Sequence, residues 1–311
     1  MHKRVISMEP MKYANNSNFK LAPYYAWVDA GGKKAASYYS LKSLRFLLPL
    51  FEKITHRSSQ KAVLCFAEPP SLDIDCFPWW GWREIIPVLW DCWPKHWNST
   101  EQWFISHDVK SAIFTSSQTA DEFRHRFPKM NILTITEGIE THVFHGEKPL
   151  SKRTIDILQY GRVAKLWGSM NYGEGIHSVC SKDEKSLLHT RKDLIDALAD
   201  AKIVLCIPRC DMQPEIAGNI ETLTQRYWEC MLSGTIILGR APQELIDLIG
   251  YDPTVHLRQE CMIEQVRSII RHIEDYQELV DRNRAVALEK ADWSLRIKKI
   301  MEWLREKGYE V

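Results

Sequence analysis

Short runs of consecutive apolar residues recur along the chain, separated by segments whose apolar positions repeat every three to four residues. Continuous runs are typical of buried parallel strands, and the longer period is typical of amphipathic helices. Strands are predicted in the first half at 4–8, 62–67, 85–90, 112–115 and 131–135. Helices are predicted at 35–54, with a kink at Pro49, and at 101–112 and 119–127. Residues 9–34, rich in Asn, Tyr, Pro and Gly, predict a long loop.

A second series of the same kind follows a polar link at 146–149. Its strands are predicted at 155–160, 203–208 and 235–238. Its helices are predicted at 184–200, 223–232, 243–249, 260–272, 276–289 and 295–307, with a loop at 209–220. Strands that alternate with helices indicate α/β folding around parallel sheets. The sequence therefore predicts two Rossmann-like domains, 1–148 and 149–311.

Composition narrows the class of protein. The 311 residues are 45% hydrophobic, enough for two cores, and the formal net charge of +1 argues against nucleic acid as a partner. Residues 1–62 carry 11 Lys or Arg against three acidic residues, an excess of eight that suits a phosphate-bearing substrate or an anionic membrane face. No signal peptide or apolar run of membrane-spanning length is visible, and the eight cysteines lack CxxC pairs. We expect a cytoplasmic protein, soluble or peripheral at the inner face of the membrane, with reduced thiols.

The most informative stretch holds two glutamates eight positions apart, Glu221 and Glu229, followed by Gly234 and a β-branched strand. Eight residues are just over two helical turns, so the two carboxylates are expected on one side of a helix. The start of that helix, beside Thr222 and Thr224, offers free backbone N–H groups that suit a phosphate.

This stretch resembles the C-terminal domain of retaining GT-B glycosyltransferases of the group 1, or family 4-like, type. The resemblance implies two facing Rossmann-like domains with a cleft between them. It also implies that Glu221 faces the donor sugar and that Glu229 binds the ribose hydroxyls. The family's glycines after the first Glu are replaced here by Thr222, Leu223 and Thr224.

The resemblance extends upstream to Tyr160-Gly161-Arg162-Val163-Ala164-Lys165, which is similar to the first strand and turn of the donor-binding domain. There an Arg and a Lys hold the donor diphosphate, which implies that role for Arg162 and Lys165 beside Gly161. Fixed cations stabilise the negative charge that develops as the sugar departs. Arg226 is a further candidate that could enter the site from the helix.

In the first half, the segments 116–120 and 135–144 are similar to the family's strand–helix step and to the end of its first domain. Trp293 and the helix after it resemble the helix that returns to that domain. Where many relatives carry a His that reaches the sugar, this chain has Asp91, with His96 nearby. Asp91 is either an acceptor-binding carboxylate or the N-cap of a helix.

Other features each carry two interpretations. Gly31 and Gly32 before a helix could cradle a phosphate or form a plain turn. The segment 41–56 could dock on an anionic membrane or pack in its own core. Tryptophans stand at 79, 80, 82, 90, 93 and 97, where they could stack on an acceptor sugar or fill a core. The D-x-D of Asp73 and Asp75 has the form of a metal site, but the order of elements argues against it.

The function predicted from these features is transfer of a sugar, with retention, from a nucleotide-diphosphate sugar to a hydroxyl of a glycan or lipid-linked acceptor. The resemblance places this reaction in polysaccharide or glycoconjugate biosynthesis, with no metal and no cofactor. A nucleotide-sugar epimerase of the same fold and a non-catalytic nucleotide-sugar-binding protein are the alternatives. An NAD oxidoreductase is disfavoured because neither half has GxGxxG after its first strand.

Overall fold

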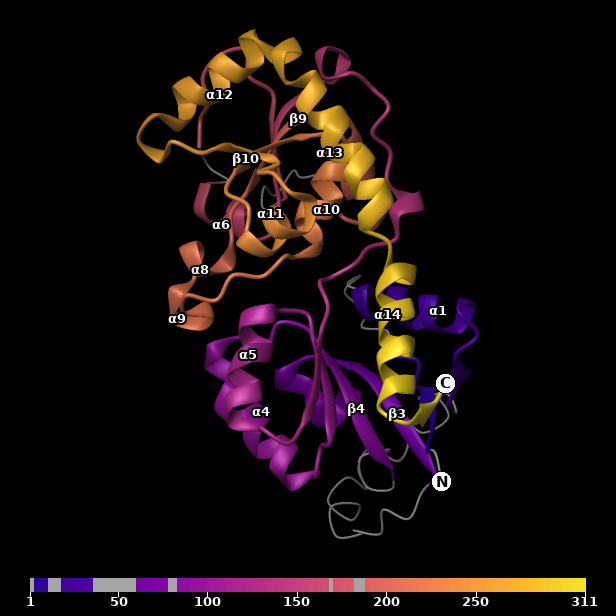
Figure 1. The fold of residues 1–311 in the computed structure, drawn as a ribbon. Coiled ribbons are helices and arrows are strands. Elements are labelled where there is room, and N and C mark those ends of the chain that lie inside the picture. The colour runs from indigo at the N-terminus through magenta and orange to yellow at the C-terminus, as the bar shows by residue number, and fades with distance from the viewer. Residues whose placement is uncertain (1–2, 11–17, 36–59, 78–82, 168–169, 182–187) are drawn as a thin grey trace. The chain divides into compact units, whose positions relative to one another are not determined.

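The computed structural model describes residues 3–10, 18–35, 60–77, 83–167, 170–181 and 188–311. It divides into two compact units, drawn together in Figure 1. Unit 1 comprises Met1–Glu137, Gln213–Thr222 and Trp293–Val311, and unit 2 comprises Gly138–Met212 and Leu223–Asp292. Each unit holds one parallel sheet with helices, which confirms the predicted α/β class. Within the described residues, no helix combines the length and apolar character that crossing a bilayer requires.

The sheet of unit 1 is wholly parallel, with the order β12-β1-β3-β4-β5-β6, and β2 pairs with β1. Its strands are β1 (Lys3–Ser7), β2 (Lys33–Lys34), β3 (Lys61–Ala67), β4 (Glu84–Leu89), β5 (Ser111–Phe114), β6 (Asn131–Thr134) and β12 (Tyr309–Glu310). Its described helices are α1 (Leu21–Asp29), α3 (Leu72–Asp75), α4 (Pro94–Ser106), α5 (Ser117–Arg126), α9 (Pro214–Ala217) and α14 (Trp293–Glu306).

Alternate residues of each strand in unit 1 reach opposite faces of the sheet. In β3, Val63 and Cys65 join the core cluster that contains Phe104 of α4 and Phe123 of α5. Leu64 points the other way, into the cluster formed with α1 and α14. Both faces of the sheet are therefore covered, as Figure 1 shows, and this is why the strands are apolar at successive positions.

Unit 2 has a five-stranded parallel sheet with the order β11-β10-β9-β7-β8. Its strands are β7 (Ile155–Gln159), β8 (Ser178–Cys180), β9 (Ala201–Cys206), β10 (Ile236–Gly239) and β11 (Thr254–His256). Its helices, within the described residues, are α6 (Arg162–Trp167), α7 (Arg191–Asp200), α8 (Arg209–Met212), α10 (Gln225–Leu232), α11 (Gln243–Ile249), α12 (Met262–Arg271) and α13 (Gln277–Lys290).

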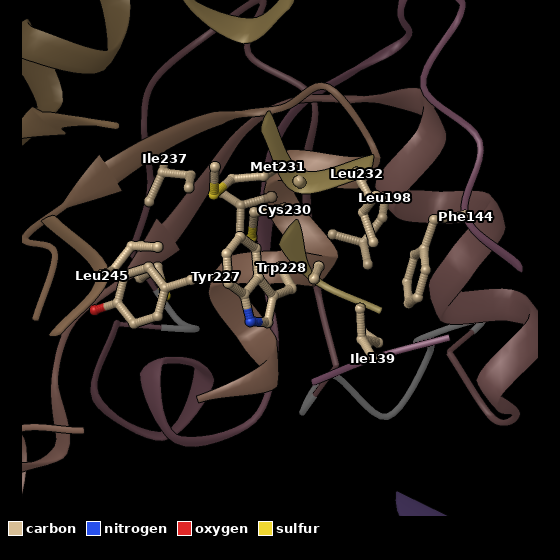
Figure 2. Packing of buried hydrophobic residues seen from close by; sticks show 14 of the residues in the cluster. Ile139, Phe144, Leu198, Tyr227, Trp228, Cys230, Met231, Leu232, Ile237 and Leu245 are labelled. Atoms are coloured by element: carbon tan, nitrogen blue, oxygen red, sulfur yellow. The ribbon is translucent and has the colours of Figure 1, made fainter. Parts of the chain in front are cut away.

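Helix α10 is the central element of one core of unit 2. Figure 2 shows Tyr227, Trp228 and Met231 of this helix among the side chains of neighbouring elements. Trp228 and Met231 have no exposed surface, and Tyr227 is 1% exposed. Because one face of α10 is fixed in this way, its polar positions Arg226 and Glu229 are held in defined places.

The eight strands predicted from apolar runs are confirmed within one or two residues at each end, whereas the short strands β2, β8, β11 and β12 were not predicted. The long loop predicted at 9–34 is wrong, because α1 forms there: Pro23 lies in the first turn, where proline is tolerated, and Tyr24 and Trp27 fill the core. The loop predicted at 209–220 contains two short helices, and the helix predicted at 101–112 spans Pro94–Ser106 instead. The helix predicted at 35–54 lies almost wholly outside the described residues.

Candidate active site

Three residues of unit 2 meet where β7 ends and α10 begins: Tyr160, Arg226 and Glu229. Tyr160 directly follows β7, and its hydroxyl donates a hydrogen bond of 2.7 Å to Glu229 Oε2. The Arg226 guanidinium carbon lies 4.6 Å from the centroid of the Tyr160 ring, within the range of a cation–π contact. Since Arg226 and Glu229 are three positions apart on α10, they share one side of the helix. These three residues are called the β7–α10 cluster below.

Gly161 makes room for the guanidinium of the β7–α10 cluster. Its φ is +65°, a left-handed conformation that favours glycine. A Cβ atom built at this position would lie 2.1 Å from Arg226 Nη2. The turn after β7 therefore needs glycine both for its backbone and for the close approach of Arg226.

Arg226 has no hydrogen bond or ion pair to any part of the chain that the structure describes. Burial would lower the pKa of Arg226, but the negative charge that Tyr160 and Cys206 gain once they ionise at high pH, together with that of Glu229, outweighs this effect and raises the pKa. The guanidinium is thus a cation stacked on one ring, and none of the described residues accepts a hydrogen bond from it. Such a group is suited to an anionic ligand that accepts several hydrogen bonds in one plane.

Tyr160 is held as a neutral hydrogen-bond donor. Its side chain is buried, and burial raises the pKa of the hydroxyl well above its usual value, with Cys230 and Glu229 adding to the rise. Burial likewise raises the pKa of Cys206, at the end of β9, to about 12. The environment of the β7–α10 cluster therefore keeps these neighbouring groups uncharged.

Arg162 and Lys165, the predicted diphosphate residues, both lie on the short helix α6 directly after Gly161. They are three positions apart, so they project from the same side of the helix. Arg162 is partly buried and is close enough to Cys206 to affect the pKa of that thiol, whereas Lys165 is exposed. Cationic side chains are therefore gathered around the end of β7, on α6 and on α10.

The helix of the two-glutamate motif is shorter than predicted. Helix α10 begins at Gln225, so Glu221 stands four positions before it, and the argument that both carboxylates share a helical face is wrong. Glu221 falls in unit 1, where its backbone N–H donates to Gln118 Oε1 at 2.7 Å, and Glu229 falls in unit 2. Gly234 ends the motif helix with a φ of +61°, as predicted.

The two threonines of the motif differ in their surroundings. The Thr222 hydroxyl is buried and donates to the carbonyl of Thr115 at 3.3 Å. Thr224 is the N-cap residue of α10 but its side chain makes no capping hydrogen bond. The N–H of Leu223 between them donates to Glu244 Oε2 at 2.9 Å, so a carboxylate already occupies this backbone donor. The predicted phosphate site at Thr222 and Thr224 stays a prediction.

In unit 1, acidic side chains lie where β3 and β4 end. Asp91 follows β4 in a left-handed conformation, with a φ of +48°. The N-cap residue of α4 is Trp93, so the interpretation of Asp91 as a helix cap is wrong, and an acceptor contact stays a prediction. Sequence reasoning missed Glu68, although it follows the apolar run of β3 as Asp91 follows β4. Burial raises the pKa of Glu68, Lys20 lowers it, and Asp91 and Asp75 raise it further.

Gly31 and Gly32 do not present free N–H groups. The N–H of Gly31 donates to Val28 O at 2.9 Å, and that of Gly32 donates to Trp27 O at 2.9 Å. The two glycines therefore end helix α1, and the phosphate cradle predicted there is wrong. A Cβ at Gly32 would lie 2.3 Å from the Trp27 indole, which explains this glycine by packing alone.

The remaining predicted features have structural partners. Asp75 forms a buried ion pair with Lys20 at 2.6 Å, and Asp73 accepts a hydrogen bond of 2.6 Å from Trp103 Nε1. Trp90 and Trp93 are 2% and 3% exposed, which favours core packing over sugar stacking. Within the described part of the chain, no three His, Cys, Asp or Glu side chains are grouped to hold a metal ion. The tryptophans at 79, 80 and 82 and the whole segment 41–56 lie outside the described residues.

Comparison with known protein families gives one match. Residues 148–302, about half of the chain, match the model of a family described as glycosyl transferase-like. This range contains β7, α6 and α10 and therefore the whole β7–α10 cluster. No curated protein sequence is a significant match.

Solved structures of glycosyltransferases share the fold. HepE of Anabaena, solved in complex with UDP and glucose, aligns with a TM-score of 0.61 and 13% identity over 98% of this chain and 100% of that one. Sucrose-phosphate synthase of Thermosynechococcus elongatus aligns with a TM-score of 0.58 and 11% identity over 98% of this chain and 99% of that one. TarM aligns with a TM-score of 0.53 and 13% identity over 84% of this chain, which spans 58% of TarM. At sequence identities of 11–13%, this structural similarity shows that the chain shares their fold.

Proposed function

We propose that this chain, which has the fold of GT-B glycosyltransferases and matches a glycosyl transferase-like family over residues 148–302, transfers a sugar from a nucleotide-diphosphate sugar to a hydroxyl acceptor, using a donor site at the β7–α10 cluster of unit 2. The observation that carries the proposal is Arg226, a stacked guanidinium without a hydrogen-bond partner in the described residues, beside a glycine turn at the end of a parallel strand. In open α/β sheets, ligands bind outside the carboxyl ends of the strands. HepE, of the same fold, was solved with UDP-glucose.

We assign the charges of the cluster to the two halves of the donor. Arg226, with Arg162 and Lys165 of α6, meets the diphosphate, whose oxygens match the planar fork of a guanidinium. Glu229 accepts hydrogen bonds from the ribose hydroxyls, as the carboxylate in a dinucleotide site does. The donor sugar is assigned to Glu221 by the family resemblance alone. A phosphate contact at Thr222 and Thr224 is assigned on the same ground.

The reaction needs stabilisation of charge on the leaving diphosphate. When the bond between the anomeric carbon and the β-phosphate oxygen breaks, negative charge develops on that phosphate, and fixed cations stabilise it without reorganisation. Three cationic side chains can do this in place of a metal ion. We propose that the acceptor hydroxyl attacks from the same face, with retention, and that a phosphate oxygen of the leaving group takes its proton.

The proposal extends to the acceptor and to the cellular setting. Asp91 follows β4 and has a left-handed backbone conformation. We assign its carboxylate to a hydroxyl of the acceptor. A glycan or a lipid-linked glycan in polysaccharide or glycoconjugate biosynthesis is the proposed acceptor. A cytoplasmic location, with peripheral contact to the membrane, is proposed from the basic excess of residues 1–62.

A nucleotide panel tests the donor site. UDP, GDP, ADP, CMP and NAD are added to the wild type and to Arg226→Lys, and the rise in melting temperature is measured, since a ligand that binds only the folded state stabilises it by mass action. We expect one nucleoside diphosphate to stabilise the wild type. Lysine keeps the charge but loses the fork and the stacking, so its affinity falls by about tenfold.

Arg282→Lys is the matched control, because Arg282 also stacks on a tyrosine, Tyr251, at 3.7 Å, but on helix α13. Its affinity for the nucleotide should equal that of the wild type. Binding of NAD alone, or of no nucleotide, would contradict the proposed function. Release of free nucleoside diphosphate from the matching nucleotide sugar, measured with added acceptor, then tests transfer itself.

A further inference from the structure

The hydrogen bond between Tyr160 and Glu229 occupies only one side of the carboxylate. Glu229 Oε2 accepts from the Tyr160 hydroxyl at 2.7 Å, and Oε1 has no hydrogen-bond partner within the residues that the structure describes. A carboxylate without any contact can rotate about its last bond, whereas one anchored by a short hydrogen bond keeps the second oxygen in one direction. Glu229 therefore presents one free, oriented acceptor.

Tyr160 is itself fixed on several sides. Its side chain is 6% exposed, Arg226 stacks on its ring, and its hydroxyl lies 3.9 Å from the sulfur of Cys230. The backbone after it is set by the left-handed turn at Gly161. The phenol also remains a donor over the ordinary pH range, because burial raises its pKa well above the usual value. The anchor of Glu229 is thus rigid and constant.

The free oxygen of Glu229 suits a particular kind of partner. A carboxylate accepts hydrogen bonds from hydroxyl groups, and a pair of neighbouring hydroxyls on a sugar ring can use both the free oxygen and the remaining lone pair of the anchored one. Ribose has such a pair at its 2′ and 3′ positions, and a dideoxyribose has none. The strength of this contact depends on orientation, because a buried hydrogen bond weakens steeply away from linear geometry.

We propose that Tyr160 is a positioning residue that sets the selectivity of the donor site for ribonucleotides over their deoxy counterparts, by holding the Glu229 carboxylate toward the ribose diol. The inference rests on the proposed donor site and adds to it a residue that touches the carboxylate but not the ligand. It separates two roles within the cluster: Arg226 contributes affinity for the diphosphate, and Tyr160 with Glu229 contributes discrimination at the ribose.

The test compares two dissociation constants by isothermal titration calorimetry. The probes are the nucleoside diphosphate that binds best among UDP, GDP and ADP, and its 2′,3′-dideoxy form. In Tyr160→Phe the ring remains for Arg226 to stack on, and only the hydroxyl is lost. We expect the ribonucleotide to bind roughly five- to tenfold more weakly than to the wild type, and the dideoxy form to bind unchanged. The dissociation constant of the dideoxy form divided by that of the ribonucleotide should therefore shrink by the same factor.

Tyr227→Phe is the matched control. Tyr227 is also a buried tyrosine of unit 2, and its hydroxyl donates to the carbonyl of Arg240 at 2.6 Å instead of to Glu229. It should lose stability but keep the wild-type ratio. Glu229→Gln, which keeps the size of the side chain, should lower the ratio at least as far as Tyr160→Phe does.

The outcomes separate the inference from the function beneath it. If the wild type binds a nucleoside diphosphate and Tyr160→Phe keeps the full ratio, the positioning role is overturned and the donor site stands. A wild type that binds the ribo and dideoxy forms equally also overturns it. If the wild type binds no nucleoside diphosphate, both the donor site and the inference are overturned.

Discussion

At the scale of single residues, Gly161 connects a backbone angle to the placement of a charge. Alanine at this position would have to adopt a φ of +65°, which costs about 1–2 kcal/mol for a residue with a Cβ. Its Cβ would also fall 2.1 Å from Arg226 Nη2, so the guanidinium must leave its place over Tyr160. We expect Gly161→Ala to lose stability and, in addition, to lose about tenfold in affinity for the nucleoside diphosphate.

Gly250→Ala separates the two effects. Gly250 has a φ of +85°, but nothing lies within 4 Å of a Cβ built there. Its free energy of unfolding should fall by a similar amount, measured by urea denaturation, while nucleotide affinity remains that of the wild type. Equal affinities in both variants would show that the position of Arg226 does not depend on Gly161.

At the scale of elements, a buried ion pair joins the start of α1 to the end of α3 in unit 1. The side chains of Lys20 and Asp75 are 5% and 2% exposed, and Asp75 also accepts from the N–H of Glu68 and from the Ser71 hydroxyl. Removing one partner of such a pair leaves an uncompensated buried charge. We expect Lys20→Met to lower the free energy of unfolding by about 3 kcal/mol, measured by chemical denaturation.

The matched control is Lys110→Met, because Lys110 pairs with Asp108 on the surface, where both side chains are more than 60% exposed. An exposed pair contributes about 0–1 kcal/mol, so this variant should be close to the wild type. The double variant Lys20→Met with Asp75→Leu should cost less than the sum of the two single changes. Strict additivity would contradict the coupling of the two side chains.

Elements were predictable from sequence where burial is complete and local. The run 62–67 is apolar at every position because both faces of β3 are covered, and so it was recognised as a strand. Helix α1 was missed because Pro23 and two tyrosines are typical of loops, and only packing against the sheet decides otherwise. The start of α10 was also misjudged: Thr224 stands at the N-cap position without a capping hydrogen bond, and Glu221 to Leu223 carry no signal that separates extended backbone from a first turn.

The same limit applies to the candidate site. The sequence indicated Gly161, Arg162 and Glu229 through a family resemblance and Arg226 as a further candidate on the helix, but it could not bring Arg226 to the ring of Tyr160. That contact joins residues 66 positions apart and depends on how α10 packs beside β7. Asp91 was found because it ends an apolar run, and Glu68 ends one in the same way. Contacts of this kind follow from the order of strands, which short motifs do not encode.

At the scale of the whole molecule, the chain returns to unit 1 twice after first leaving it at Glu137, with Gln213–Thr222 and then with Trp293–Val311. The boundary predicted from the polar link at 146–149 gives each domain one continuous segment, and only the helix after Trp293 was expected to return to the first domain. The two glutamates of the motif consequently belong to different units although only seven residues separate them. A change of pH can test whether the stability of each unit responds separately.

The two units contain buried or paired carboxyl groups with opposite pKa shifts. In unit 2, burial would raise the pKa of Asp200, but hydrogen bonds from Lys148 and Thr154 outweigh it and lower the pKa. The ionised form therefore stabilises the fold above the unfolded-state pKa, and this contribution is lost as pH falls through the lower folded-state value. In unit 1, burial raises the pKa of Glu68, so ionisation costs stability at neutral pH and the cost disappears as pH falls through the raised value.

Two variants should therefore depart from the wild type in opposite directions at pH 7. Asp200→Asn should unfold at a lower temperature, by an amount that corresponds to about 1 kcal/mol for the lost ion pair with Lys148, and the gap should close as pH falls through the lowered folded-state pKa of Asp200. Glu68→Gln should unfold at a higher temperature by a similar amount, and its gap should close as pH falls below the raised pKa of Glu68. Calorimetry of both variants and the wild type across this pH range measures the two differences in melting temperature.

A Glu68→Gln variant that is less stable than the wild type at pH 7 would mean that the Glu68 carboxylate is stabilised by its surroundings, and would contradict the assigned direction. With both directions as assigned, acid weakens unit 2 through Asp200 while it relieves unit 1 at Glu68, because hydrogen-bond donors surround the carboxylate of Asp200, whereas the carboxylate of Glu68 is penalised chiefly by burial.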